Sequence, residues 1–280
     1  MKPKISLGMS PCPNDTFMFY HLLHHSDFSK KYDIDLQIMD IQDLNELLKS
    51  KEVDFCKSSF GLIPKVLEDY VVLRSGSALG HACGPLLVSK NKAMTKQDLL
   101  GSKILIPGLD TSAFSLLRAY LGSDFNAEEC LFSEIMPALG RGEADAGLII
   151  HESRFTYEDF ALSCLVDLGE WWEQKYSLPI PLGAISAKRY VGNEVIEEFS
   201  NALKASVEWA FSQDWKENKE FSNFICGHAK EISEEVLDSH IALYVNQESI
   251  ELSEQAIGAI EKMFSQLKNR EISRSEFLFS

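Results

Sequence analysis

The chain has 280 residues, of which 45% are hydrophobic and 25% charged, and its 27 Lys and Arg residues against 42 Asp and Glu residues give a formal charge of −15. This composition excludes wholesale disorder, and the length suffices for one large or two medium-sized domains. The acidic excess, without a concentrated basic patch, excludes nucleic acid and anionic membrane surfaces as expected partners. The first third of the chain is nearly neutral, which makes it the better place to receive a small anion.

The sequence predicts a cytoplasmic protein without membrane insertion. No stretch approaches the roughly 18 consecutive apolar residues that span a bilayer. The N-terminal segment MKPKISLGMSPCPNDTF lacks a long apolar core, so it does not predict a secretory signal. The six cysteines are scattered without a C-x-x-C pair, which favours reduced core thiols over a disulfide framework or a metal site.

Short apolar strands alternate with amphipathic helices through the first 180 residues. Strands are predicted at 4–9, 33–39, 53–56, 70–74, 86–89, 103–106 and 144–150. Helices are predicted from a cap at Asn14 or Asp15 through His24, and then at 44–49, 63–67, 112–121 and 135–141. This alternation predicts an α/β architecture built on mostly parallel sheets.

The pattern becomes helical from residue 193 onward. Helices are predicted at 195–211, 219–226, 234–244 and 253–268. Two apolar runs, 84–90 and 182–188, bracket the middle of the chain and are predicted as strands that cross between two lobes. We predict a first lobe from residues 1–88 and 184–280, a second lobe inserted at 89–183, and a ligand cleft between them. Trp171 and Trp172 are expected to pack between the lobes or against the hinge.

Common catalytic motifs are missing from the sequence. It has no G-x-G-x-x-G loop after a strand, no P-loop, no G-x-S-x-G elbow and no zinc-ligand spacing. The segment 10–17 nevertheless places Asn14 and Asp15 at the start of a predicted helix, where free N–H groups bind anions. The alternative for both residues is a rigid turn with helix-capping side chains.

Two further segments place hydroxyl groups where α/β sheets bind ligands. Lys57, Ser58 and Ser59 follow the predicted strand 53–56, at its carboxyl end. Thr111 and Ser112 lie between the strand 103–106 and the helix 112–121, where they offer hydroxyls to a carboxylate. For each segment the alternative is ordinary helix capping, and for Thr111 and Ser112 the two interpretations are compatible.

The fourth segment, 142–154, contains an apolar strand that ends on His151. An imidazole at the mouth of a buried strand is well placed for acid–base catalysis, since the reference pKa of imidazole is about 6.5. The alternative is a structural histidine satisfied by Glu152 or by the backbone at the strand end. From these residues alone, both interpretations stay open.

Five segments carry a resemblance to a known family. They are SPCPNDTF (10–17), RSGSALG (74–80), GEADAGLIIHESRFTY (142–157), VDLGEWWE (166–173) and LPIPLGAI (178–185). Together they resemble the 1,4-dihydroxy-6-naphthoate synthases of the futalosine route of menaquinone biosynthesis. The similarity runs from the first predicted strand to the helical tail.

The resemblance implies a fold like that of type II periplasmic binding proteins, with two α/β lobes and a cleft. It implies a lyase that converts cyclic dehypoxanthine futalosine, an anionic small molecule, to 1,4-dihydroxy-6-naphthoate without a cofactor. It assigns the proton-accepting role to His151. The substrate contacts of the family fall on a loop and on a helix start in this chain: Lys57, Ser58, Ser59, Thr111 and Ser112.

Two other functions stay open at this stage. The fold alone would favour a non-catalytic protein that binds a small carboxylate, although the position of His151 in a long motif counts against it. A chorismate dehydratase of the same pathway would share the fold. The HESRFTY segment argues for the naphthoate synthase instead.

Overall fold

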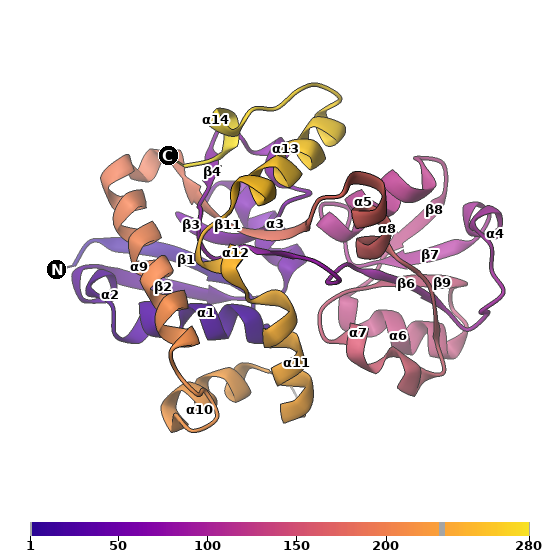
Figure 1. Cartoon of the computed structure of the whole chain (residues 1–280), viewed down its shortest axis with the longest axis horizontal. Helices are drawn as coiled ribbons and strands as arrows, with labels where there is room; N and C mark the ends of the chain where they lie inside the picture. The colour runs from indigo at the N-terminus through magenta and orange to yellow at the C-terminus, as the bar shows by residue number, and fades with distance from the viewer. Residues whose placement is uncertain (1, 230–232, 280) are drawn as a thin grey trace.

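The computed structural model describes residues 2–229 and 233–279, and these form two sheets in two parts of the molecule (Figure 1). We call the parts built on them the first and the second lobe. The first sheet has the order β2-β1-β3-β11-β4, with β5 also paired to β11, and the second has the order β10-β6-β9-β7-β8. The strands of the first sheet are β1 (Lys4–Met9), β2 (Asp33–Ile38), β3 (Phe55–Ser59), β4 (Tyr70–Val72), β5 (Ala78–Gly80) and β11 (Ile180–Lys188). Those of the second are β6 (Leu86–Ser89), β7 (Lys103–Ile106), β8 (Asn126–Glu129), β9 (Ala146–Ile149) and β10 (Ser163–Asp167).

Both sheets are mixed, which corrects the prediction of mostly parallel sheets. β1 pairs in parallel with β2 and β3, whereas β11 is antiparallel to β3, β4 and β5. In the second sheet, β7 is parallel to β8 and β9, and β6 is antiparallel to β9 and β10. The strands that run antiparallel to their neighbours are β6, by which the chain enters the second sheet, and β11, by which it returns to the first. Because each lies inside its sheet, it forms antiparallel ladders on both sides.

Helices surround the sheets and make up most of the C-terminal region. They are α1 (Pro13–His24), α2 (Asp27–Lys31), α3 (Ile41–Ser50), α4 (Lys96–Leu100), α5 (Ser112–Leu121), α6 (Phe132–Arg141), α7 (Ser153–Thr156), α8 (Leu168–Tyr176), α9 (Asn193–Phe211), α10 (Lys219–His228), α11 (Glu234–Tyr244), α12 (Gln247–Ile250), α13 (Glu254–Lys268) and α14 (Arg274–Phe277). Short 3₁₀ turns lie at η1 (Ile63–Lys65), η2 (Tyr157–Phe160) and η3 (Arg189–Val191). The four predicted C-terminal helices are confirmed as α9, α10, α11 and α13.

The start of α1 differs from the prediction. Cys12 is the N-cap residue and Pro13 the first helical residue, so neither Asn14 nor Asp15 caps the helix. Proline favours the first helical position because its missing N–H would be unpaired there in any case. The two polar side chains lie instead within the first turn and are buried, which frees them for contacts with other elements.

Several elements were not predicted, and their sequences explain why. β8 reads Asn-Ala-Glu-Glu and is largely exposed at the edge of the second sheet, so it has no apolar pattern to detect. β5 has only three residues, too few for a recognisable pattern. No strand or helix was predicted in the segment around Trp171 and Trp172, which contains β10 and α8. The predicted lobe boundaries at 88/89 and 183/184 fall within β6 and β11, and the division at those residues remains a prediction.

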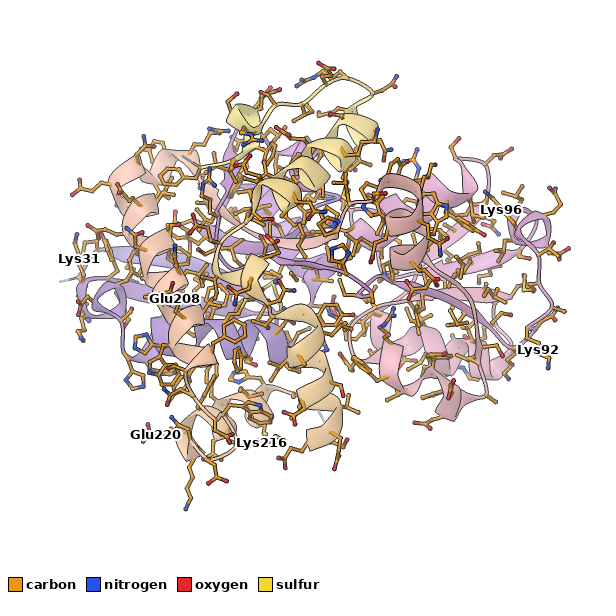
Figure 2. All side chains as sticks on the ribbon, viewed as in Figure 1. Lys31, Lys92, Lys96, Glu208, Lys216 and Glu220 are labelled. Atoms are coloured by element: carbon orange, nitrogen blue, oxygen red, sulfur yellow. The ribbon has the colours of Figure 1, made fainter. Side chains whose placement is uncertain are left out.

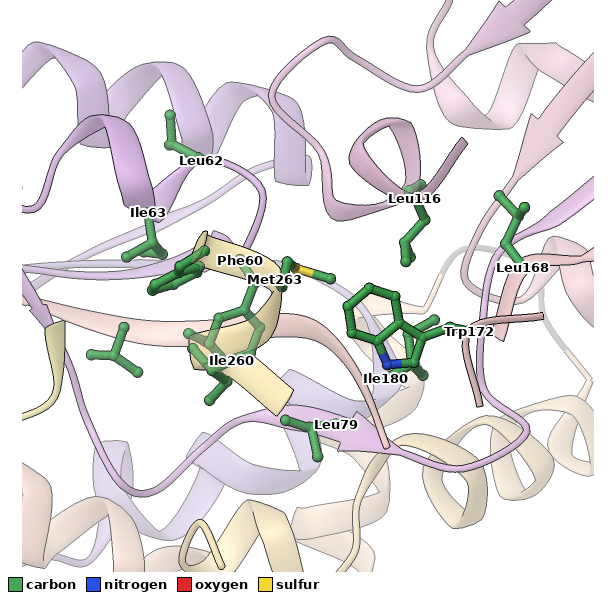
Figure 3. Packing of buried hydrophobic residues seen from close by; sticks show 14 of the residues in the cluster. Phe60, Leu62, Ile63, Leu79, Leu116, Leu168, Trp172, Ile180, Ile260 and Met263 are labelled. Atoms are coloured by element: carbon green, nitrogen blue, oxygen red, sulfur yellow. The ribbon is translucent and has the colours of Figure 1, made fainter. Parts of the chain in front are cut away.

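Trp172 packs where the two lobes meet, as the sequence predicted. Its side chain is 1% exposed and belongs to one apolar cluster with Leu116 of α5, Ile180 of β11 and Met263 of α13 (Figure 3). Its indole Nε1 donates to the Pro179 carbonyl at 3.1 Å. The crossing strand β11 is thereby fixed to α8 beside the cleft.

The surface is charged, and the cysteines are distributed between core and surface. The charged side chains labelled in Figure 2 are all exposed. Cys12, Cys56 and Cys83 are buried, but Cys164 and Cys226 are exposed, so the prediction of core thiols fails for those two. Within the described residues, no helix combines the length and the hydropathy needed to cross a membrane.

Candidate functional site

A cavity lies between the lobes. Both lobes and both crossing segments contribute to its walls. The lining residues are Ser10, Asn14, Ile41, Lys57, Ser59, Ala78, Cys83, Pro85, Thr111, Ser112, Ala113, Ile150, His151, Leu182, Gly183 and Tyr244. Six of the eight predicted site residues are among them, and Asp15 and Ser58 are not.

His151 stands at the cavity in an unusual backbone conformation. It follows β9 by two residues and has φ = 56°, in the left-handed region. Four of the other non-glycine residues with positive φ cap helices, whereas His151 does not. Such a conformation costs about 1–3 kcal/mol and tends to occur at functional sites. The ring lies edge-to-face with Phe132, at 5.2 Å between centroids, and its Nδ1 is 3.5 Å from Cys12 Sγ.

Lys57 and Asp15 form a buried ion pair at the first-lobe side of the cavity. Lys57 Nζ donates to Asp15 Oδ1 at 2.6 Å, and their side chains are 6% and 0% exposed. Asp15 also accepts hydrogen bonds from the backbone N–H and the hydroxyl of Ser10 and from the Asn14 amide. A buried charge is tolerated only when it is paired and hydrogen-bonded, and this carboxylate is both. Asp15 therefore holds the ammonium group of Lys57 in place without itself lining the cavity.

Strand alternation separates Ser58 from Ser59. Lys57, Ser58 and Ser59 lie within β3 rather than after it, because the strand extends to Ser59. Successive side chains of a strand point to opposite faces. Ser59 therefore shares the cavity face with Lys57 and is held by Asn45, whereas the Ser58 hydroxyl pairs with that of Ser186 at 2.8 Å.

Thr111 and Ser112 bring the start of α5 to the opposite wall. The Thr111 hydroxyl accepts from the Phe114 N–H as the N-cap of α5 and donates to the Gly108 carbonyl, so the capping interpretation is confirmed. The Ser112 hydroxyl accepts from the Gly61 N–H at 3.1 Å and donates to the Leu182 carbonyl. Both contacts of Ser112 join the second lobe to the first.

Two residues of α11 belong to the same region and were not predicted. His240 is fully buried, and its Nε2 donates to Asn14 Oδ1 at 3.0 Å, because the Asn14 NH₂ group is already directed to Asp15. Burial lowers the pKa of His240 well below its usual range, with further lowering from His151 and Lys57. Tyr244 lines the cavity, and burial raises the pKa of its hydroxyl, which stays protonated. Neither residue could be recognised from the sequence, since both fit the apolar periodicity of a helix.

This arrangement suits a planar anionic molecule. The ammonium group of Lys57 and the hydroxyls of Ser59 and Thr111 can bind a carboxylate, and Ile41, Ile150 and Leu182 provide apolar contacts for a ring. Among residues 2–229 and 233–279, no group of three or more His, Cys, Asp or Glu side chains is arranged to hold a metal ion. Imidazole is the side chain best suited to acid–base chemistry near neutral pH, and His151 brings one to this cavity.

Two lobes, a cleft lined from both and two crossing segments define the class of type II periplasmic-binding-protein folds. An alkanesulfonate-binding protein from Xanthomonas axonopodis, solved with MOPS, superposes with a TM-score of 0.71 at 16% identity, over 98% of this chain and 96% of that one. A protein from Archaeoglobus fulgidus superposes with a TM-score of 0.83 at 30% identity, over 95% of this chain and 98% of that one.

The chain belongs to the menaquinone biosynthesis family, whose sequence profile matches residues 5–269. It is 38% identical to the 1,4-dihydroxy-6-naphthoate synthase of Thermus thermophilus, over 95% of this chain and 94% of that protein. It is 36% identical to the synthase of the same name from Streptomyces coelicolor, over 93% and 92% of the two chains. These findings confirm the resemblance identified from the sequence, and identify the chain as an enzyme of menaquinone biosynthesis.

Proposed function

We propose that this chain is a lyase that converts cyclic dehypoxanthine futalosine to 1,4-dihydroxy-6-naphthoate, with His151 as the proton acceptor. The observation that carries the proposal is the position of His151 at a cavity between two lobes, which a buried lysine also lines, in a chain similar throughout to two synthases of that name. The two relatives favour this function over a binding protein or a chorismate dehydratase. A cytoplasmic location is part of the proposal.

The substrate carboxylate would bind beside Lys57. An ammonium group has three N–H donors, and Asp15 takes one of them. The other two N–H groups are available to a ligand. The ammonium group is already held in place by Asp15 before the ligand binds. Gly183 makes room for this side chain, because a Cβ there would lie 2.9 Å from Lys57 Cε. Ser59, Thr111, Ser112 and Asn14 are the proposed polar contacts around it.

His151 would start the reaction by taking a proton from the substrate. The electron pair left behind drives cleavage of the carbon–carbon bond to the sugar-derived carbons. Loss of those carbons makes the second ring aromatic, which favours the forward direction. A cleft that closes around the substrate excludes water, which strengthens the interaction of the ring carboxylate with Lys57.

The test is direct incubation of the purified chain with cyclic dehypoxanthine futalosine. We expect the naphthoate absorbance to appear, chromatography to identify the product, and added EDTA to leave the rate unchanged. The matched control is His151→Gln, which keeps a polar side chain of similar size but offers no basic nitrogen. Calorimetric binding of the substrate with no product formed by the wild-type chain would instead identify a binding protein and overturn the proposal.

A further inference from the structure

Cys12 and His151 meet across the cleft. Cys12 belongs to the first lobe, directly before α1, and His151 belongs to the second, two residues after β9. Their closest polar atoms, Cys12 Sγ and His151 Nδ1, are 3.5 Å apart, within hydrogen-bonding distance for sulfur. The contact joins the sequence segments 10–17 and 142–157.

This contact bears on which ring nitrogen of His151 can act as a base. A neutral imidazole carries one proton, and only its other nitrogen can accept a second. If Nδ1 carries the proton, the N–H donates to Cys12 Sγ and the lone pair of Nε2 is free to accept a proton from a ligand. If the thiol donates to Nδ1 instead, Nε2 carries the proton and neither nitrogen of His151 is available as a base.

Cys12 has the surroundings of a neutral, fixed acceptor. Burial raises the pKa of its thiol, and Glu152 and Asp15 raise it further, so a thiolate is disfavoured. A neutral thiol does not form the thiolate–imidazolium pair that would protonate His151 and remove its basicity. The backbone at Cys12 is held between Pro11 and Pro13, and its N–H donates to the Ser10 hydroxyl at 3.3 Å.

We propose that Cys12 is the positioning residue of His151. Its sulfur accepts a hydrogen bond from Nδ1–H and thereby holds His151 in the tautomer whose Nε2 is free to act as the base. The partners lie on different lobes, and they are in contact in this structure without a ligand. The inference rests on the proposed function, since it specifies the nitrogen through which the base acts.

The first test determines the tautomer of His151 by NMR and does not depend on enzymatic activity. The wild-type chain is labelled with ¹⁵N-histidine, and two-bond ¹H–¹⁵N correlation spectra are recorded above pH 8, where imidazole is neutral. The His151 signals are identified by their loss in His151→Gln. We expect a proton on Nδ1 in the wild type and a shift toward the Nε2–H tautomer in Cys12→Ala. A wild-type spectrum with the proton on Nε2 would overturn the inference.

The second test separates positioning from packing. Cys12→Ala should lower kcat about tenfold, as expected for the loss of one hydrogen bond, while KM changes less than about twofold. Cys12→Ser should recover most of the loss, since its hydroxyl also accepts from Nδ1–H. Cys56→Ala truncates another buried thiol, one that does not line the cavity, and should keep both kcat and the tautomer of His151.

The outcomes distinguish this inference from the proposed function. Equal kcat values for Cys12→Ala and Cys12→Ser would show that only the volume at position 12 matters, and would overturn the positioning role. If the wild-type chain turns over substrate with a proton on His151 Nε2, this inference fails alone. If no naphthoate is formed but the Nδ1–H tautomer depends on Cys12, the proposed function fails and the hydrogen bond stands.

Discussion

The two walls of the cavity differ in how their polar groups are held. On the first-lobe wall, Lys57 and Asp15 are almost fully buried and joined to each other, and Asn14 links them to His240. On the second-lobe wall, Thr111 offers a neutral hydroxyl at a helix start, and His151 is half-buried in a left-handed backbone conformation.

The difference indicates a division of tasks. A buried network in a low-dielectric interior is fixed before any ligand arrives, because each member loses its partners if it moves. The second wall instead carries the proposed base on the other lobe. We infer that the first wall anchors the anion and that the second completes the site when the cleft is closed.

The largest expected effect tests the second wall. His151→Gln should lower turnover about 10²–10⁴-fold, because no other group would accept the proton, while the fold is retained. Steady-state rates from the naphthoate absorbance, with circular dichroism to verify the fold, measure both. A folded variant with near-normal turnover would remove His151 from the mechanism.

The next effect tests whether the first wall depends on its buried charges. Asp15→Ala leaves the Lys57 ammonium buried without a counter-ion, which should lower the free energy of unfolding by about 3–5 kcal/mol. Lys57→Met should cost less, since Asp15 keeps three neutral hydrogen-bond contacts, yet it should abolish carboxylate binding. Urea unfolding and calorimetry measure the two quantities. Asp27→Ala, which breaks an exposed ion pair with Lys30, is the control and should change little. Equal stability losses at positions 15 and 27 would contradict this account of the first wall.

The third prediction separates ligand binding from capping on the second wall. Thr111→Val removes an N-cap and should lower stability by about 1 kcal/mol. Thr95→Val removes the equivalent cap of α4, away from the cavity, and should cost a similar amount. Only Thr111→Val should also raise KM, since a lost hydrogen bond to a charged group costs about 1.5–3 kcal/mol. An unchanged KM would restrict Thr111 to its structural role.

The fourth prediction concerns the pH dependence of the first wall. The folded-state pKa of His240 lies below its unfolded value of about 6.5, so the unfolded chain binds an extra proton between these two pH values. Stability is therefore complete above about pH 6.5 and falls as the pH drops below it, by up to about 1.4 kcal/mol per pH unit for one proton. His21 and His24, whose pKa values are also lowered by burial, add to the loss. When the free energy of unfolding in urea is plotted against pH, His240→Gln should show a shallower slope below pH 6.5 than the wild type. An identical slope for His240→Gln would contradict the burial of an uncharged imidazole.

The parts of this site that could be predicted are those with a local pattern in the sequence. Short apolar runs located β1, β7 and the strand before His151, because most of their side chains are buried. The same reasoning could not place Ser58 and Ser59 on opposite faces, since that depends on β3 extending to Ser59. His240 and Tyr244 were missed because a polar group on an apolar helix face has no distinct local pattern, and only tertiary packing brings α11 against Asn14.

The smallest expected effect tests whether the two walls move. Asp110, at the start of the α5 region, bridges Lys49 and Lys65 of the first lobe at 2.7 and 2.5 Å. Both lysines are partly exposed, so the pairs are worth at most about 1 kcal/mol each. Gly84 and Gly183 lie in the two crossing segments, and neither has a positive φ. A Cβ at Gly84 would lie 2.2 Å from the Gly169 nitrogen, so this glycine allows two backbone segments to pack closely.

Small-angle scattering measures this motion. The radius of gyration of the wild type should lie near 19 Å, the approximate expectation for ~280 residues, and should fall modestly with a saturating naphthoate product. Asp110→Asn should give a larger value without ligand and the same value with it, because the ligand replaces the lost ion pairs in holding the lobes together. Asp27→Asn removes an exposed charge far from the cleft and should scatter like the wild type. If neither ligand nor Asp110→Asn changes the scattering or the hydrogen exchange at 84–90 and 182–188, the cleft is rigid and both walls are fixed before the substrate binds.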